Sequence, residues 1–371
     1  MTLRDRILAV YRRETPDVVP FMLDLSHWFY HRNRLPWDLS KSYDTPELEL
    51  LDFHKQHGIG FYLPNLASFY EVSYADDVQA RVIKSAGGDE ITWEYQTPVG
   101  TIRRTRRWDD HSYSWAIPAW GIHSEKELRA LGYALSRRVY QPRWDRYLAW
   151  KEQIGSVGVA YAVFAYSGMG HLLNYWLGIQ GTVNAMLDWP DAMRDVIDQI
   201  NKNNLLCVDM LAQSPAEVVL VGDNFSSDLQ PPAFFNEWSR AYYEQVVRRL
   251  HDAGKYVAVH VDGRLRGLLS VFRDIGVDCI DAVTPAPMGD LDPAQCRAEA
   301  GDQLILSGGV PPTLWLEDTD VRTFEAAVLR WLDLKRQSPR LIANAGDQVP
   351  PHAPEDRIFL MRDLVEQHGR F

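Results

Sequence analysis

The 371-residue chain has few cysteines, no long apolar run and fewer basic than acidic side chains. Its three cysteines, Cys207, Cys279 and Cys296, are too few and too scattered for a disulfide framework or a C-x-x-C metal site. No stretch approaches the ~18 consecutive apolar residues that a membrane-spanning helix needs. The first residues are charged and amphipathic, unlike a signal peptide. We therefore expect a cytoplasmic protein with no membrane partner.

The net charge of the chain limits the classes of binding partner that we expect. Lys and Arg total 39 and Asp and Glu total 50, which gives a formal net charge of −11. An acidic chain repels polyanions, so nucleic acid is not an expected partner. Hydrophobic residues make up 46% and charged residues 24%, which is the balance of a globular enzyme-sized protein able to bury a large core.

Short apolar runs and longer amphipathic segments alternate through the second half of the chain. The apolar runs are continuous, which is typical of strands covered on both faces. They lie at 158–164, 217–221, 256–260, 279–283, 304–307 and 340–343. The helix-like segments lie at 191–212, 232–253, 265–275, 320–335 and 354–368. This alternation predicts a parallel sheet.

The N-terminal part adds two apolar runs, at 18–23 and 60–63, separated by a helix-like segment at 46–57. Together the runs supply about eight strands, the number in a (β/α)8 TIM barrel. The alternative is a doubly wound open sheet, which we disfavour because no glycine-rich phosphate turn follows the first strand. We expect an α/β fold in which 1–371 is a single barrel domain.

The segment from about 71 to 120 breaks the alternation. Its runs at 79–83, 90–95 and 101–106 alternate apolar and polar residues, with glycine- and proline-containing turns between them. We expect a β-meander, inserted after the second barrel strand and large enough to cap one end of the barrel.

In a TIM barrel the chemistry lies at the carboxyl ends of the strands. His260 and Asp262 end the fifth run two residues apart, so on an extended chain both point the same way. Asp347 follows the eighth run, across the narrow mouth of the barrel, and Asp223 follows the fourth run, beside His260. These four residues are the candidate catalytic residues.

A histidine with carboxylates is also a donor set for a divalent metal with an open position, with His260, Asp262 and Asp347 as the ligands. The alternative is structural. Asp262 would cap the helix that begins near Arg264, and His260 would be a satisfied barrel residue.

Polar and aromatic side chains after the other strands are candidate substrate-binding residues. They are Asp24, His27, Trp28, Asn65, Tyr166, Asn224 and Asn344. The aromatic run at 27–31, which we place in a loop, either lines an aromatic substrate pocket or packs under the meander. His27 and Tyr166 are candidate secondary proton donors.

Several motifs carry a family resemblance. They are WEYQTPVGTI at 93–102, VGDNFSS at 221–227, HVDG at 260–263, ILSGGV at 305–310, and NAGDQVPP at 344–351 followed by APED at 353–356. In this order they resemble the uroporphyrinogen decarboxylase superfamily, specifically its corrinoid-dependent methyltransferase branch. The resemblance covers nearly the whole chain.

The resemblance implies a (β/α)8 barrel that moves a methyl group between a substrate and a corrinoid carried by a separate protein. Several such enzymes bind zinc through a His-x-Cys motif after strand five and a Cys after strand eight. Residue by residue, these positions are His260, Asp262 and Asp347 here, and an acidic residue after strand four corresponds to Asp223. The implied cofactors are a divalent metal, zinc first, and the corrinoid.

This chain departs from the pattern because carboxylates replace both thiolates. Carboxylates suit harder oxygen chemistry, which favours a methyl ether over a thiol as substrate, and the many aromatic residues suit an aromatic ether. Uroporphyrinogen decarboxylases themselves carry an Arg-rich stretch after strand one. Here the first arginine in that region is Arg32, so a polyanionic porphyrinogen is disfavoured.

The leading hypothesis is an O-demethylating methyltransferase component in which a metal polarises the substrate oxygen. Without a metal, Asp262 or Asp347 with a raised pKa would protonate the leaving oxygen. Two rival functions are a decarboxylase or lyase acting on a small acid, and a non-catalytic barrel that binds a small ligand. The sequence leaves a homodimer open.

Overall fold

The computed structural model describes residues 1–35, 37–39, 45–63, 69–164 and 166–371. The helices are α1 Leu3–Tyr11, α2 Ser26–Arg32, α3 Thr45–His57, α4 Glu125–Ser136, α5 Trp144–Ile154, α6 Gly168–His171, α7 Gly178–Asp188, α8 Pro190–Ala212, α9 Pro232–Trp238, α10 Arg240–Asp252, α11 Leu268–Asp274, α12 Pro293–Ala300, α13 Val321–Leu332 and α14 Glu355–His368. The strands are β1 Tyr70–Tyr74, β2 Gln79–Lys84, β3 Glu90–Gln96, β4 Thr101–Asp109, β5 Ser114–Ala116, β6 Arg138–Pro142, β7 Ala162–Phe164, β8 Val218–Phe225, β9 Tyr256–Val261, β10 Cys279–Val283, β11 Ile305–Val310 and β12 Leu341–Ala345.

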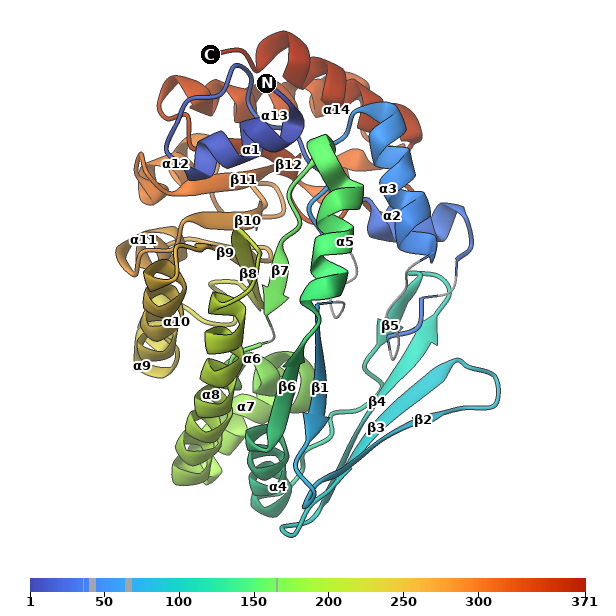
Figure 1. Ribbon diagram of the computed structural model, residues 1–371, viewed down its shortest axis with the longest axis vertical. Helices are drawn as coiled ribbons and strands as arrows, with labels where there is room; N and C mark the ends of the chain where they lie inside the picture. Colours follow the sequence, from blue (N-terminus) through green and yellow to red (C-terminus); the bar gives the residue numbers. More distant parts are fainter. Residues whose placement is uncertain (36, 40–44, 64–68, 165) are drawn as a thin grey trace.

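A six-stranded parallel sheet forms the centre of the molecule, in the order β12-β11-β10-β9-β8-β7 (Figure 1). Its strands are those predicted from the continuous apolar runs in the second half of the chain, and every residue of β10, β11 and β12 is buried. Helices lie between consecutive strands, as a parallel sheet requires. The predicted α/β class is confirmed.

The first two predicted strands form isolated parallel bridges rather than full strands. Phe21 bridges to Ala343 of β12, Met22 bridges to Gly60, and Phe61 bridges to Gly158 ahead of β7. A Cβ atom at Gly158 would lie 1.7 Å from the carbonyl oxygen of Phe61, so only glycine permits this approach. These single bridges place the segment at 21–22 beside β12 and the segment at 60–61 beside the residues ahead of β7.

Two helix predictions need correction. The segment predicted as one helix at 232–253 is two helices, because the helical conformation is interrupted at Ser239 between α9 and α10. The aromatic run at 27–31, predicted as a loop, belongs to α2. Ahead of α2, the Asp24 carboxylate accepts hydrogen bonds from the backbone N–H and the hydroxyl of Ser26, which orders the start of the helix.

The predicted antiparallel meander is present as the sheet β2-β3-β4-β5, which we call the meander sheet. Its strands cover the three runs predicted at 79–83, 90–95 and 101–106. In Figure 1 it extends beside the parallel sheet, on the side of β1 and β6, which pair with each other. Tyr95 and Ile102 of the meander sheet pack into a buried cluster with Trp176.

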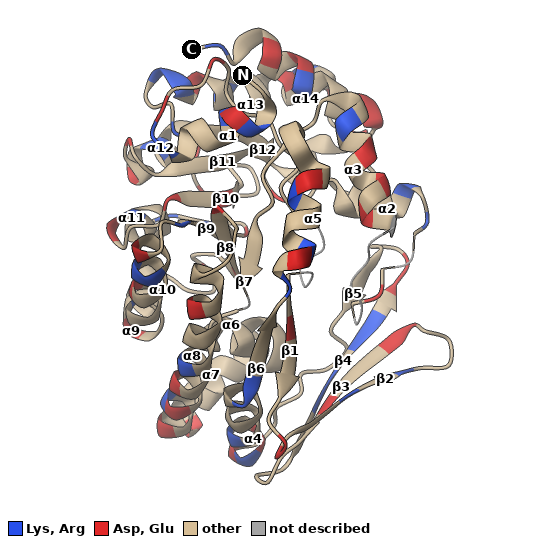
Figure 2. Cartoon of the chain, viewed as in Figure 1, with Lys and Arg blue, Asp and Glu red and all other residues tan. Residues whose placement is uncertain are grey.

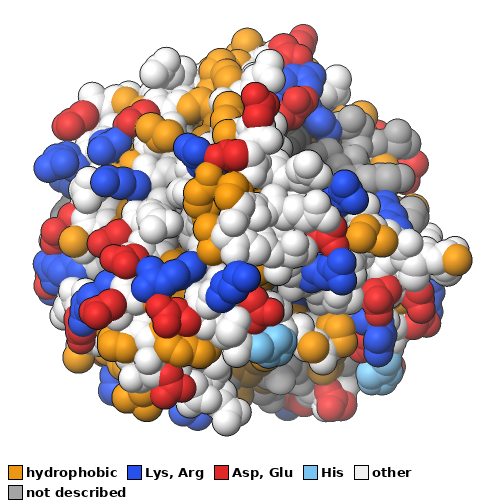
Figure 3. Space-filling model, turned by 90° about the horizontal axis from the view of Figure 1, so that it is seen from below, with side chains coloured by type: hydrophobic (Ala, Val, Ile, Leu, Met, Phe, Trp, Pro, Cys, Tyr) orange, Lys and Arg blue, Asp and Glu red, His pale blue; other side chains and the backbone are white. Residues whose placement is uncertain are grey.

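No helix in the described parts of the chain combines the length and the apolar character needed to span a membrane. Charged residues are distributed over the helices and the meander sheet, and β4 carries a basic stretch (Figure 2). Basic and acidic side chains are interspersed with hydrophobic ones on the face seen from below (Figure 3).

Candidate active site

A chain of buried polar side chains crosses the parallel sheet near the carboxyl ends of its strands. Nδ1 of His260 on β9 lies 3.1 Å from Oδ2 of Asp281 on β10. The hydroxyl of Ser307 on β11 donates to the other oxygen of Asp281 over 3.4 Å. Because side chains at matching positions of parallel strands share a face, three neighbouring strands contribute to one polar layer.

Asn344 on β12 extends this layer to the N-terminal segments. Its side-chain amide donates to Ser307 Oγ and to the hydroxyl of Tyr62, each over 3.3 Å. Asp281, Ser307 and Asn344 are at most 1% exposed, so the network is closed to solvent on its inner side. We call Tyr62, His260, Asp281, Ser307 and Asn344 the buried network.

The outer edge of the buried network is His260, whose other ring nitrogen faces Asp347. Nε2 of His260 lies 4.0 Å from Oδ1 of Asp347. Burial alone would lower the pKa of His260, but the hydrogen bond and the negative charge of Asp281 outweigh it and raise the pKa to about 9. Burial raises the pKa of Asp347 to about 6, with the nearby charge of Asp262 adding to the rise and His260 opposing it.

Asp24 lies beside Asp347 and completes the mouth. Its Oδ2 accepts a hydrogen bond from Nε2 of Gln348 over 3.1 Å, and the same Gln348 nitrogen donates to Ser26 Oγ over 3.1 Å. The backbone N–H of Val349 donates to the Asp24 carbonyl, which ties the loop after β12 to the segment before α2. Asp24 therefore contacts the loop that carries Asp347, and its hydrogen bonds with Ser26 and Gln348 restrain it.

Asp262 lies one residue beyond the end of β9, near enough to His260 and Asp347 for its charge to act on both. β9 ends at Val261 and the chain turns at Gly263, which has a φ of +83°, so Asp262 is exposed beyond the strand. Asp262 lines a cavity of about 470 Å³ together with Asn174, Asn224 and Met288. The backbone N–H of Asp262 still donates to the carbonyl of Phe225 on β8, and the Asp262 charge raises the pKa of both His260 and Asp347.

These positions do not fit a divalent metal. Among the described residues, no three His, Cys, Asp or Glu side chains are arranged to hold one. Nε2 of His260 and one Asp347 oxygen are neighbours, but the Asp262 carboxylate makes no hydrogen bond or ion pair with either in the described part of the chain.

Asp223 is buried and hydrogen-bonded to the surrounding helices. Its carboxylate accepts hydrogen bonds from the backbone N–H and hydroxyl of Ser167, which caps α6, and from the hydroxyl of Tyr243 over 2.6 Å. It is 1% exposed, and burial raises its pKa to about 6 against the opposing effect of these donors. The hydrogen bonds of Asp223 thus connect β8 to α6 and α10.

The aromatic residues of α2 divide between the core and the meander sheet: Trp28 and Phe29 pack against Phe53 of α3, whereas His27 contacts the turn between β4 and β5. Trp28 is 2% exposed, belongs to the main core and donates its indole N–H to the carbonyl of Ala353. Nε2 of His27 lies within hydrogen-bond distance of the carbonyls of Ser112 and Tyr113. Of the two alternatives for this run, the structure places Trp28 with packing. Asn65, another predicted binding residue, lies outside the described residues.

Tyr166 and Asn224 lie together at the ends of β7 and β8. The Tyr166 hydroxyl donates to Oδ1 of Asn224 over 3.4 Å. Asn224 has a φ of +48°, a conformation that asparagine tolerates better than most residues, and it lines the cavity that Asp262 also lines. Both residues are thus placed at the mouth, on the side away from Asp347.

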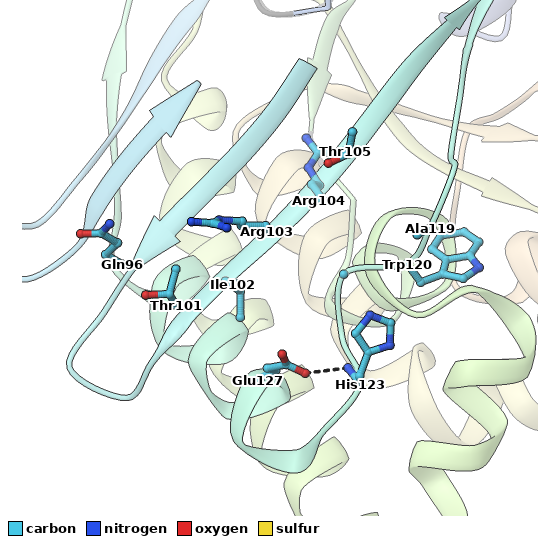
Figure 4. Close-up of a pocket in the computed structure, with 11 residues that line it drawn as sticks. Gln96, Thr101, Ile102, Arg103, Arg104, Thr105, Ala119, Trp120, His123 and Glu127 are labelled. Carbon is cyan, nitrogen blue, oxygen red and sulfur yellow. Dashed lines mark hydrogen bonds between the residues drawn. The ribbon is translucent and has the colours of Figure 1, made fainter. Parts of the chain in front are cut away.

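A second cavity of about 510 Å³ lies along the free edge of β4 and is bounded by Thr101, Arg103, Trp120 and Glu127 (Figure 4). Oε2 of Glu127 accepts a hydrogen bond from the backbone N–H of His123 there. It is formed by the meander sheet and the segment before α4, away from the buried network.

The sequence prediction missed Tyr62, Asp281 and Ser307. Asp281 sits in the centre of the apolar run at 279–283, and a carboxylate flanked by buried strand residues must have a polar partner. The single carboxylate within this apolar run was the sequence feature that could have identified Asp281 as a candidate site residue. The identity of its partner depends on strand register, since Asp281 pairs with His260 across β9 and β10.

Comparison with known proteins agrees with this architecture. A family model described as uroporphyrinogen decarboxylase (URO-D) matches residues 163–368, which is more than half of the chain. Uroporphyrinogen decarboxylase 1, chloroplastic, from Oryza sativa subsp. japonica is 23% identical over 215 residues, covering 57% of this chain and 50% of that protein. Uroporphyrinogen decarboxylase from Aromatoleum aromaticum is 26% identical over 184 residues, covering 49% of each chain. The chain thus spans about half the length of these curated relatives.

A structural likeness extends further along the chain. A methyltransferase from Methanosarcina mazei has a TM-score of 0.64 and 14% sequence identity, with 99% of both chains covered. At this level of identity the likeness establishes a shared fold, including the part of the chain before residue 163.

Proposed function

Because the chain belongs to the uroporphyrinogen decarboxylase family, we propose that it is a methyltransferase that removes the methyl group of a small oxygen-methylated substrate. The acceptor is a corrinoid carried by a separate protein. The full-length likeness to a methyltransferase fold supports this branch of the family.

One observation carries the proposal: a cationic histidine at the strand ends with one ring nitrogen held from behind. Asp281 fixes Nδ1 of His260, so Nε2 carries a proton toward Asp347 and the mouth. The Asp281 carboxylate stabilises the imidazolium, as in other histidine–carboxylate pairs. This arrangement is built to deliver a proton at a defined atom.

Demethylation of an ether needs such a proton. The bond between the methyl carbon and oxygen breaks, the methyl group leaves without the bonding electron pair, and the oxygen keeps that pair and accepts a proton. The reduced corrinoid supplies the electron pair that forms the new bond to the methyl carbon. His260 donates the proton from Nε2, and the Asp347 carboxylate lies 4.0 Å from the same atom, where its negative charge favours the protonated imidazole.

The dimensions of the site agree with a small substrate. The cavity of about 470 Å³ beside Asp262 lies within the usual range for small-molecule sites. We propose that the corrinoid approaches from outside the strand ends, delivered by another protein.

The test is methyl transfer by the purified chain from a panel of methoxyaromatic compounds to free reduced corrinoid, followed by absorption spectra and by release of the phenol. We expect transfer, and a loss of about 10²–10⁴-fold in His260→Ala, the range for removal of a general acid. His251→Ala is a matched control, because Nε2 of His251 pairs with Asp278 over 2.8 Å at the opposite end of these strands. It should keep the activity.

Two outcomes would replace the proposal. Release of carbon dioxide from a small acid without corrinoid methylation would identify a decarboxylase, in which His260 protonates carbon instead of oxygen. Saturable ligand binding with no turnover of any tested ether would identify a binding barrel. Equal activity of the His260→Ala variant and the native protein would remove the proton-donor role while leaving methyl transfer itself intact.

A further inference from the structure

A row of apolar side chains lies exposed along α7. Ile179, Val183 and Leu187 are 57%, 49% and 76% exposed, whereas Thr182 and Ala185 of the same helix are buried. Residues four apart lie on one face of a helix, so the three apolar side chains form a row about 12 Å long. We call Ile179, Val183 and Leu187 the α7 stripe.

The exposed face of α7 carries almost no charge. The helix has the sequence GIQGTVNAMLD, in which the single ionisable residue, Asp188, is the last one. Charged residues make up 24% of the whole chain, and the exposed faces of helices usually hold many of them. The other exposed side chains beside the α7 stripe include the uncharged Gln180 and Asn184. This composition is typical of the centre of a protein interface, where charged residues are depleted.

The α7 stripe begins at the cavity of the candidate active site. Ile179 lines the cavity of about 470 Å³ that Asn224 and Asp262 also line. Met288, another exposed apolar residue, lines the same cavity. In Figure 1 the carboxyl end of β7 points toward α6 and α7. A protein seated on the α7 stripe would therefore also lie against this cavity.

The buried side of α7 is fixed to the rest of the fold. Gly178, the first residue of the helix, has a φ of +68°, and a Cβ atom there would lie 2.4 Å from the Trp120 ring. Only glycine permits this approach, so the ring packs directly on the start of α7. Ala185 belongs to the buried cluster that also contains Trp176. The α7 stripe is thus a preformed surface that no described segment covers.

The size of the α7 stripe fits a partner that binds and leaves. Three aliphatic side chains expose on the order of a few hundred Å², the size of a functional patch on a monomer. Each partner in a stable complex contributes ~800 Å². A permanent homodimer needs a larger surface, and a second copy here would lie against the cavity that the corrinoid has to reach. A carrier that delivers a cofactor in each turnover needs only a small, weak contact.

We propose that the α7 stripe is the docking surface for the protein that carries the corrinoid. This inference rests on the proposed function for the identity of the partner, while the surface itself stands on the exposure and position of α7. The apolar face of the partner packs on Val183 and Leu187. Its corrinoid then lies next to Ile179, at the cavity that holds the ether.

The test compares two methyl acceptors in steady-state assays of the full chain. One is free reduced cobalamin, and the other is a corrinoid protein purified, by its absorption spectrum, from the cells that make this chain. Val183→Lys and Leu187→Gln should each raise KM for the corrinoid protein at least tenfold and leave the rate with free cobalamin within twofold of the native rate. Leu187→Gln introduces no charge, so its effect reports the loss of apolar contact.

Leu148→Gln on α5 is the matched control. Leu148 is 53% exposed and lies outside the cavity, so its substitution should leave KM for the corrinoid protein unchanged. Melting temperatures verify folding and should match the native value, because all three substituted side chains are exposed.

Three outcomes would overturn the proposal. The first is an unchanged KM for the corrinoid protein in both stripe variants. The second is an equal loss with both acceptors, since the α7 stripe would then act on the substrate cavity. The third is a native dimer in sedimentation that either stripe substitution converts to a monomer, which would identify a contact between two copies of this chain.

Direct binding separates the docking surface from the proposed function. The affinity between the chain and the corrinoid protein is measured by interferometry without any ether. Tenfold tighter binding by the native chain than by Leu187→Gln, with no methyl transfer to either acceptor, would refute the methyltransferase and retain the docking surface. Methyl transfer to the corrinoid protein with the same KM in every variant would retain the methyltransferase and refute the docking surface.

Discussion

The charge of His260 depends on a carboxylate from the neighbouring strand. Asp281 is fully buried and hydrogen-bonds Nδ1 of His260, and this contact opposes the effect of burial on the imidazole. The sequence did mark His260 and Asp347 as neighbours, because both follow strands at one end of a parallel sheet. It could not mark Asp281 as the partner, since nothing in an apolar run specifies which adjacent strand faces its single charge.

Asp281→Asn is predicted to move the pH dependence of methyl transfer. The raised pKa of His260, about 9, means that the donor is protonated below that pH and is lost as the pH rises through it. In the variant, burial acts unopposed by Asp281, so the loss should begin near or below pH 6.5. Imidazole NMR titration gives the same shift without requiring turnover. Asp278→Asn should shift His251 instead, and an unmoved His260 titration in Asp281→Asn would contradict the argument.

Trp28 provides a test of packing against binding at a single residue. It is 2% exposed and its indole N–H satisfies the Ala353 carbonyl, so Trp28→Ala should lower the free energy of unfolding by about 3–5 kcal/mol. Denaturant unfolding measures this loss. Binding of methoxyaromatic ligands at a temperature where the variant stays folded should change little. A large loss of affinity with little loss of stability would instead indicate that Trp28 lines the substrate pocket.

Element by element, periodicity predicted the parallel strands well because those strands are buried on both faces and contain little except apolar residues. The break between α9 and α10 was missed, since an amphipathic pattern continues through Ser239 while the backbone turns there. The helical nature of α2 was also missed. A seven-residue helix rich in aromatic and β-favouring side chains depends on tertiary contacts, such as the hydrogen bond from the Trp28 indole to the Ala353 carbonyl, more than on propensity.

The meander sheet is fastened to the segment after α2 by a few specific bonds. The Tyr113 hydroxyl donates to the carbonyl of Leu35 over 2.6 Å, and the Trp115 indole donates to the carbonyl of Trp37 over 2.5 Å. Tyr113→Phe should therefore cost about 1 kcal/mol and release this end of the sheet. Hydrogen exchange should speed up in β5 and the end of β4 while β9–β12 keep their protection. Uniform acceleration across both sheets would show that the bond supports global stability instead.

At the scale of the whole molecule, two buried groups make opposite contributions to stability as the pH changes. Burial lowers the pKa of His54 to about 4, so the folded protein excludes the cation. Its contribution is complete above pH 6.5 and is lost as the pH falls through about 4. Burial raises the pKa of Asp223 to about 6, so its contribution is complete below pH 3.8 and is lost as the pH rises through about 6.

Substitution should separate these contributions. His54→Asn keeps a donor near the carbonyls of Ile59 and Gly60 but removes the titration. In the native protein, the lowered pKa of His54 makes the free energy of unfolding rise by about 3 kcal/mol between pH 4 and 6.5. This rise should be absent in His54→Asn. The raised pKa of Asp223 makes the free energy of unfolding of the native protein fall by a similar amount between pH 4 and 6, and this fall should be absent in Asp223→Asn. Because the two changes have opposite signs, a general loss of stability cannot mimic both. Denaturant titrations at half-unit pH steps measure these changes. Parallel pH profiles of the free energy of unfolding for the two variants and the native protein would mean that neither group governs stability at acidic pH.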